Sequence, residues 1–252
     1  MIARHLFTQA MTASLPDSRL SAIPSPSRPT HHRWFWPMLA SAILATATGA
    51  LGLSYWHWLF KPLTMVAAIV YVAFSACHTG ARAIFHPQSP YPWLLGALLG
   101  SLAGDVFLML PGNWFVPGLV SFLLAHLCYI ALFGQGVPWF GARAALLATL
   151  ALGVGMYAFL WQGGLPATLR MPVAAYVLVI ALMAAQAWAR RAALPGRPAL
   201  LVALGACCFM LSDALLATNR FVQPLPLAQL WVLASYYAAQ LLIVAGVLRA
   251  RS

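Results

Sequence analysis

Apolar residues along the chain gather into long runs that short polar segments interrupt. Each run is close to the length of about 20 residues that an α-helix needs to cross the hydrocarbon core of a bilayer. The runs lack the alternation of apolar and polar residues that is typical of membrane β-strands. The pattern predicts an all-α bundle of eight transmembrane helices over residues 35–54, 62–79, 92–110, 115–134, 142–161, 171–189, 199–217 and 229–248.

Two parts of the chain differ in character. Residues 34–252 are taken up by the apolar runs and by Pro- and Gly-containing turns, such as HPQSPYP at 86–92, so we expect one transmembrane domain there. Residues 1–33 contain four arginines and a Pro/Ser-rich stretch, which predicts a disordered basic N-terminal tail. The tail lacks the small-residue cleavage site of a signal peptide.

The composition supports the membrane interpretation. Hydrophobic residues make up 63% of the chain and charged residues 7%, against about 45–50% and about 25% in soluble proteins. A soluble protein of this size needs more charge to cover its surface. The net charge of +11 comes from basic residues that stand singly between apolar runs, so membrane lipids rather than nucleic acid are the expected partners.

The basic residues also predict an orientation. Eight spans place both ends of the chain on one side of the membrane. That side collects eleven of the fourteen Lys and Arg residues, and the opposite side holds only Lys61, Arg170 and Arg220. Because cytoplasmic loops carry an excess of Lys and Arg, we expect both termini in the cytoplasm.

Two of the three acidic residues, Asp105 and Asp213, lie inside predicted spans. An aspartate at the centre of a membrane helix costs about 2.5–3.5 kcal/mol on insertion scales, so such residues are candidates for a functional site. Each aspartate lies six residues before the turn that ends its span, about 9 Å along the helix axis. The two spans run in the same direction, so the carboxyl groups are expected at one depth.

Small residues predict which way the aspartates face. Gly96, Gly100 and Gly104 form a ridge on the span of Asp105 that lets a neighbouring helix approach closely. On the other span, Phe209 and Asp213 share a helix face. Both carboxyl groups are therefore expected to point into the bundle.

Polar residues on the spans that follow are candidate partners for the two aspartates. Span 115–134 carries His126 and Tyr129, and span 229–248 carries Tyr236, Tyr237 and Gln240. Counted along the helices, these residues fall level with the aspartates or one turn deeper. We expect a polar pocket in the bundle that opens to the non-cytoplasmic side, with a mouth lined by Lys61, Asn219 and Arg220.

Metal and disulfide chemistry are not indicated. The four cysteines lie in apolar stretches and form no C-x-x-C pair, so they are interpreted as packing residues. The histidines show no H-x-x-x-H or H-x-x-E spacing that would bring zinc ligands together. We expect neither a metal nor another cofactor.

Several motifs resemble those of the lysoplasmalogenase (YhhN) family, from about Trp34 to Leu248. They are KPLTM at 61–65, GSLAGDVFLML at 100–110, GLVSFLLAHLCYIALF at 118–133, MLSDALLATNRF at 210–221 and SYYAAQLLIVAG at 235–246. The resemblance implies an eight-span hydrolase that cleaves the vinyl ether bond of lysoplasmalogens, a class of lysophospholipid. The products are a fatty aldehyde and glycerophosphoethanolamine or glycerophosphocholine. It also implies that Asp105 and Asp213 are catalytic, and it favours a multi-pass protein of a bacterial plasma (inner) membrane.

The chemistry implied by the resemblance suits a pair of carboxyl groups. A vinyl ether is hydrolysed by protonation of its β-carbon, which leaves an oxocarbenium ion that water captures. One carboxylic acid and one carboxylate supply the acid and base that these steps need. We expect Tyr236, Tyr237 and His126 to orient the reacting groups, and Lys61 or Arg220 to contact the phosphate.

Two other classes of function remain open at the level of sequence. A proton-coupled transporter of small molecules or lipids also uses paired carboxyl groups within the membrane. The spans of Asp105 and Asp213 lack the broken middle that is typical of transporter substrate sites. A non-enzymatic lipid-binding or assembly protein would use the aspartates only to hold helices together.

Overall fold

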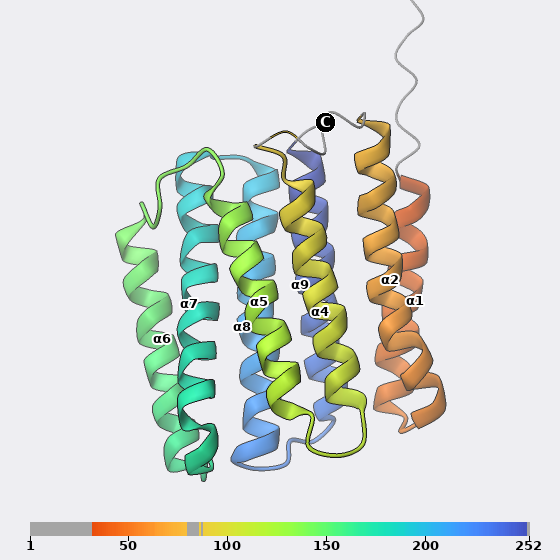
Figure 1. The fold of residues 1–252 in the computed structure, drawn as a ribbon, viewed down its shortest axis with the longest axis vertical. Coiled ribbons are helices and arrows are strands. Elements are labelled where there is room, and N and C mark those ends of the chain that lie inside the picture. The colour runs from red at the N-terminus through yellow and green to blue at the C-terminus, as the bar shows by residue number, and fades with distance from the viewer. Residues whose placement is uncertain (1–31, 80–85, 87, 251–252) are drawn as a thin grey trace, which may run out of the picture. The chain divides into compact units, whose positions relative to one another are not determined.

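The computed structural model describes residues 32–79, 86 and 88–250. These residues form α-helices and one short 3₁₀-helix, with no strand among them, which confirms the all-α prediction (Figure 1). The elements are α1 (His32–Ala50), α2 (Ser54–His78), α4 (Tyr91–Met109), α5 (Phe115–Gly134), α6 (Arg143–Gln162), η1 (Ala167–Leu169), α7 (Arg170–Ala193), α8 (Arg197–Phe221) and α9 (Ala228–Arg249). The tail predicted over residues 1–33 lies outside the described residues, apart from His32 and Arg33 at the start of α1.

The described helices have the length and composition of membrane spans. Seven of them, α2 and α4 to α9, are long and apolar enough to cross a bilayer. The apolar part of α1 is shorter and covers Phe35–Ala50. The predicted runs therefore correspond to seven candidate spans and one shorter helix, as expected for a multi-pass membrane protein.

Two predicted boundaries were wrong in a way that matters for the site. Helix α2 begins at Ser54 rather than at 62, because Pro62 lies inside the helix instead of starting it. A proline removes one backbone donor from a helix, and the remaining hydrogen bonds carry α2 past it. Helix α8 continues to Phe221, four residues beyond the predicted end. Lys61 and Arg220 are thus helical residues.

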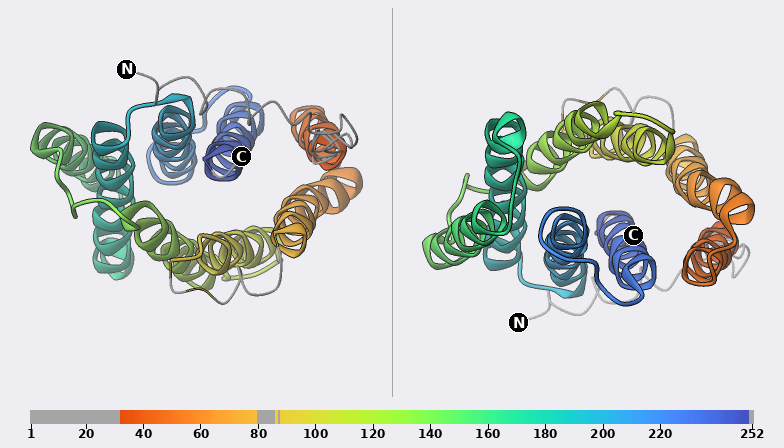
Figure 2. Two further views of the ribbon diagram at one scale, coloured as in Figure 1. Left: turned by 90° about the horizontal axis from the view of Figure 1, so that it is seen from above. Right: turned by 90° about the horizontal axis from the view of Figure 1, so that it is seen from below.

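Most of the helices form a ring when viewed along their axes (Figure 2). Helices α1, α2, α4, α5 and α7 follow one another around an arc, and α8 and α9 close it, since α8 packs on α7 and α9 packs on α1. Helix α6 lies outside this ring against α7. Polar residues of α4, α5 and α9 meet inside this ring, where Ser101, Tyr129 and Gln240 are joined by hydrogen bonds.

The glycine ridge of α4 packs against α5, as its spacing predicted. A β-carbon added at Gly100 would lie 3.1 Å from the backbone oxygen of Ser121 and 3.1 Å from the β-carbon of Ala125. At Gly104 the same atom would overlap the ring of Phe122. This close approach holds Asp105, the next residue of α4, against the interior of the ring.

We expect the substitution Gly100→Val to destabilise the protein, because the new side chain would push α4 away from α5. Overpacking of this kind costs about 1–3 kcal/mol. Thermal unfolding in detergent measures the effect as a lower midpoint. Gly155→Val on α6 is the matched control, since a β-carbon there meets no atom within 4 Å. Equal midpoints for the two variants would show that the helices do not depend on this contact.

Candidate functional site

Asp105 lies in a closed polar cluster between α2, α4 and α9. Its side chain is 3% exposed. The Lys61 Nζ atom lies 3.2 Å from Oδ1 in an ion pair, and the Tyr236 hydroxyl donates a 2.7 Å hydrogen bond to Oδ2. Both carboxylate oxygens are therefore held by partners from other helices, and the cluster joins three helices through one buried charge pair.

A second set of hydrogen bonds lies one helical turn deeper than this cluster. The Tyr129 hydroxyl donates to Oε1 of Gln240 over 2.6 Å, and Nε2 of Gln240 donates to Oγ of Ser101 over 3.2 Å. All three residues are buried. Tyr237 is also buried, with its ring centre 5.2 Å from that of Tyr236. The structure thus brings Tyr129, Tyr236, Tyr237 and Gln240 to the Asp105 side of the bundle.

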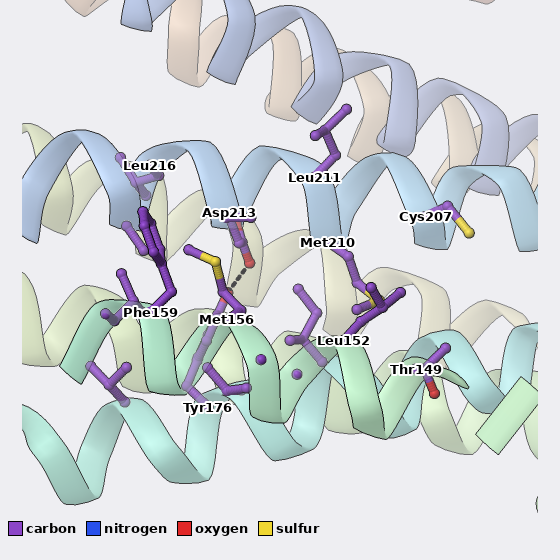
Figure 3. Close-up of a pocket in the computed structure, with 18 of the residues that line it drawn as sticks. Thr149, Leu152, Met156, Phe159, Tyr176, Cys207, Met210, Leu211, Asp213 and Leu216 are labelled. Carbon is purple, nitrogen blue, oxygen red and sulfur yellow. Dashed lines mark hydrogen bonds between the residues drawn. The ribbon is translucent and has the colours of Figure 1, made fainter. Parts of the chain in front are cut away.

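Asp213 lies in a different setting, on the wall of a cavity. The Tyr176 hydroxyl of α7 donates a hydrogen bond to Oδ2 of Asp213. Both residues line a cavity of about 1320 Å³ between α5, α6, α7 and α8. Figure 3 shows Asp213 and Tyr176 joined by this hydrogen bond, with Met156 beside them. The Asp213 carboxyl group is thus open to a ligand, whereas Asp105 does not line this cavity.

A chain of ring contacts links the tyrosine that binds Asp105 to the tyrosine that binds Asp213. The Phe209 ring packs edge-on against two other rings. Its centre lies 5.4 Å from the ring centre of Tyr236 and 4.7 Å from that of His126. The His126 ring in turn lies 5.3 Å from Tyr176. His126 is fully buried in this layer. The residues expected in one pocket therefore form two hydrogen-bonded groups, one around Asp105 and one around Asp213, and these rings pack between the tyrosines of the two groups.

The three residues expected at the mouth of the pocket have different roles. Lys61 lies inside α2 and pairs with Asp105. Asn219 accepts a 2.9 Å hydrogen bond from the backbone of Leu225 and so shapes the turn after α8. Only Arg220 lines the cavity, with its guanidinium 4.2 Å from the ring of Phe115. Of these three residues, the structure thus places Arg220 at the cavity, Lys61 at Asp105 and Asn219 at the turn after α8.

Sequence reasoning missed Tyr176, the hydrogen-bond partner of Asp213. This tyrosine lies in the predicted span 171–189, six residues after Arg170, at a depth similar to that of Asp213. A hydroxyl group inside an otherwise apolar run was the available signal. Among the described residues, no three His, Cys, Asp or Glu side chains are placed to share a metal ion.

We expect Tyr176→Phe to lower the rate of the hydrolysis that the motifs imply about tenfold. The lost hydrogen bond positions the acidic group of Asp213, and such a bond contributes about 1.5 kcal/mol or more. The ring stays in place, so unfolding should change little. Tyr157→Phe is the matched control: its hydroxyl donates to the backbone of Arg170 and it does not line the cavity. Initial rates of product release measure both variants. A Tyr176→Phe rate equal to that of the control would exclude an orienting role.

Comparisons with known proteins agree with the motifs. The sequence profile of the YhhN family matches residues 56–247. Lysoplasmalogenase TMEM86B of Homo sapiens is 33% identical over 241 residues, which cover 95% of this chain and 97% of the relative. The TMEM86B protein of Rattus norvegicus is 34% identical, with 92% and 91% covered. A lysoplasmalogenase of Mycobacterium bovis is 36% identical, with 66% and 64% covered. No solved structure matches the chain. The chain belongs to the YhhN family.

Proposed function

We propose that the protein is a membrane hydrolase that cleaves the vinyl ether bond of lysoplasmalogens to a fatty aldehyde and a glycerophosphodiester. The observation that carries the proposal is the carboxyl group of Asp213, held by Tyr176 and open to a large apolar cavity. The relatives named lysoplasmalogenase support it. They give no support to the transporter alternative.

The cavity has the dimensions and the lining of a lipid site. Its volume of about 1320 Å³ exceeds the range of about 300–1,000 Å³ that is usual for small-molecule pockets. Arg220 lies seven residues after Asp213 on α8, about 10 Å along the helix axis. In a lysophospholipid the phosphate and the vinyl ether are separated by a glycerol unit. Arg220 can therefore bind the phosphate while Asp213 meets the vinyl ether.

We assign the proton transfer to Asp213. Its Oδ2 accepts the hydroxyl hydrogen of Tyr176, which leaves Oδ1 to carry the acidic proton toward the cavity. Oδ1–H protonates the β-carbon of the vinyl ether, and the π electrons of the double bond form the new C–H bond. The positive charge that results is shared by the α-carbon and the ether oxygen. The Asp213 carboxylate formed in this step lies beside the cation and stabilises it.

The same carboxylate completes the reaction. It accepts a proton from the water molecule that attacks the α-carbon, which yields a hemiacetal and restores the acid form of Asp213. The hemiacetal then breaks its bond to the glycerol oxygen, which takes the hydroxyl proton and leaves as the alcohol. The aldehyde is the other product. One carboxyl group therefore serves as acid and then as base, without a cofactor.

Asp105 has a different part in the proposal. Because it is buried in an ion pair with Lys61 and lies outside the cavity, we assign it a positioning role. It holds the Tyr236 hydroxyl, and the Tyr236 ring packs edge-on against Phe122 at 6.1 Å. Phe122 lines the cavity. The two aspartates thus have different roles: Asp213 contacts the substrate, and Asp105 positions residues that line the cavity.

The orientation in the membrane is also a proposal. The excess of Lys and Arg on one side favours termini in the cytoplasm. This places the Arg220 end of the cavity on the non-cytoplasmic side, in the plasma membrane of a bacterium.

A fatty-aldehyde assay on the detergent-purified protein tests the function. The substrate is a lysophospholipid with a vinyl ether tail, offered with ethanolamine and choline headgroups in separate reactions. The control is the saturated ether of the same length, which has no double bond to protonate. We expect aldehyde from the vinyl ether alone. Folded protein that releases no aldehyde from either headgroup would overturn the proposal.

A further inference from the structure

The cavity continues well beyond the proposed reacting group. Its lining runs along α6 from Phe159, near the Arg220 end, to Ala144 near the other end of that helix. Met156 lies beside Asp213 in Figure 3, and Ala144 is twelve residues before it. Twelve residues correspond to about 18 Å of helix. One leaflet of a bilayer core is about 15 Å thick, so the cavity beyond Asp213 is as long as one leaflet is deep.

The lining changes character on the two sides of Asp213. Toward one end it includes Arg220, the one Lys or Arg among the lining residues. Toward the other end the lining consists of small and apolar residues. The side chains there that contain nitrogen or oxygen are Trp188 of α7 and Thr149 of α6. The cavity therefore has a charged end, a carboxyl group in the middle and an apolar end. The phosphate, the ether and the hydrocarbon tail of a lysophospholipid follow in the same order.

Two small side chains face the apolar part from opposite helices. Cys207 of α8 lies six residues before Asp213, and Ala148 of α6 lies eight residues before Met156. These separations correspond to about 9 Å and about 12 Å from the reacting group. Both residues line the cavity, and Figure 3 shows Cys207 at the same end as Thr149, the neighbour of Ala148. Larger side chains at these positions would divide the cavity.

We infer that the apolar end of the cavity holds the hydrocarbon tail of the substrate, and that Ala148 and Cys207 determine how long a tail is accepted. The inference rests on the proposed function and concerns the specificity of the Asp213 cavity for the length of the substrate tail. Because both side chains are small, the cavity stays open over its full length and accepts the long tails of membrane lipids. A bulky residue at either position would reject those tails and leave room for short ones.

The test is a competition between tails in one reaction. Ala148→Phe, Cys207→Phe and the double variant are each given an equimolar mixture of vinyl ether lysophospholipids with eight-carbon and sixteen-carbon tails. Mass spectrometry measures the ratio of the two aldehydes. Because unfolded protein contributes to neither product, the ratio reports specificity even where a variant folds less well.

We expect each variant to shift the product ratio toward the short aldehyde by at least about tenfold, since one misfitting methylene already changes discrimination by about 10-fold or more. Val154→Phe and Leu204→Phe are the matched controls, because these residues lie on α6 and α8 outside the cavity lining. They should keep the wild-type ratio. Variants that release both aldehydes in the wild-type ratio would overturn the inference and leave the hydrolase intact. A wild type that releases neither aldehyde would overturn the proposed function itself.

Discussion

Asp213→Asn is expected to reduce aldehyde release at least about 100-fold, because general acid catalysis contributes about 10²–10⁴ to the rate. The amide has the shape of the carboxyl group and still accepts the hydrogen bond of Tyr176, but it has no acidic proton to give to the β-carbon. Like the acid form of Asp213, the amide carries no charge into the membrane, so the stability of the folded protein should change little. Initial rates and thermal unfolding of the purified variant measure the two effects separately.

A neighbouring substitution separates the loss of the acid from general damage to α8. Thr218 lies five residues after Asp213, outside the cavity lining, and its hydroxyl bonds only the backbone of its own helix at Ala214. Thr218→Val should therefore keep the wild-type rate. If Asp213→Asn keeps more than a tenth of the wild-type rate while folded, Asp213 does not donate the proton and the mechanism is wrong.

The sequence predicted the helices well because the bilayer imposes their length. Helix α5 has the predicted bounds, and the glycine ridge of α4 correctly indicated a close neighbour. The errors at α2 and α8 arose where aromatic and polar residues continue a helix past its apolar run. The segment before Pro62 contains Trp56, His57 and Trp58, and its hydropathy does not distinguish a helix at the membrane surface from a loop.

The candidate site was predicted in parts. Residue type and depth indicated Asp105, Tyr236 and Gln240, which the structure brings together. The separation of Asp213 from that group depends on the rings of Phe209 and His126, and apolar spacing does not show how far two helices stand apart. The position of α6 outside the ring creates the cavity. Such an arrangement depends on which helices pack together, and the spacing of apolar residues in the sequence does not reveal those pairs.

The ion pair of Lys61 and Asp105 provides the second large expected effect. Both groups lie inside the protein, with side chains 12% and 3% exposed. Breaking a buried pair by removing one partner costs about 3–5 kcal/mol, because the other charge is left uncompensated. We therefore expect Lys61→Met and Asp105→Asn each to lower the unfolding midpoint strongly and to lose activity as the packing around Tyr236 loosens.

The double variant Lys61→Met/Asp105→Asn distinguishes a positioning role from a chemical one. It removes both charges, while the asparagine still accepts the hydrogen bond of Tyr236. A double-mutant cycle of unfolding midpoints and aldehyde rates over the four proteins measures the coupling. We expect the double variant to be more stable than either single variant and to regain measurable aldehyde release, because Asp105 acts through the ion pair and through Tyr236. A double variant that regains stability but releases no aldehyde would contradict this assignment. The carboxylate of Asp105 would then have to take part in the reaction itself.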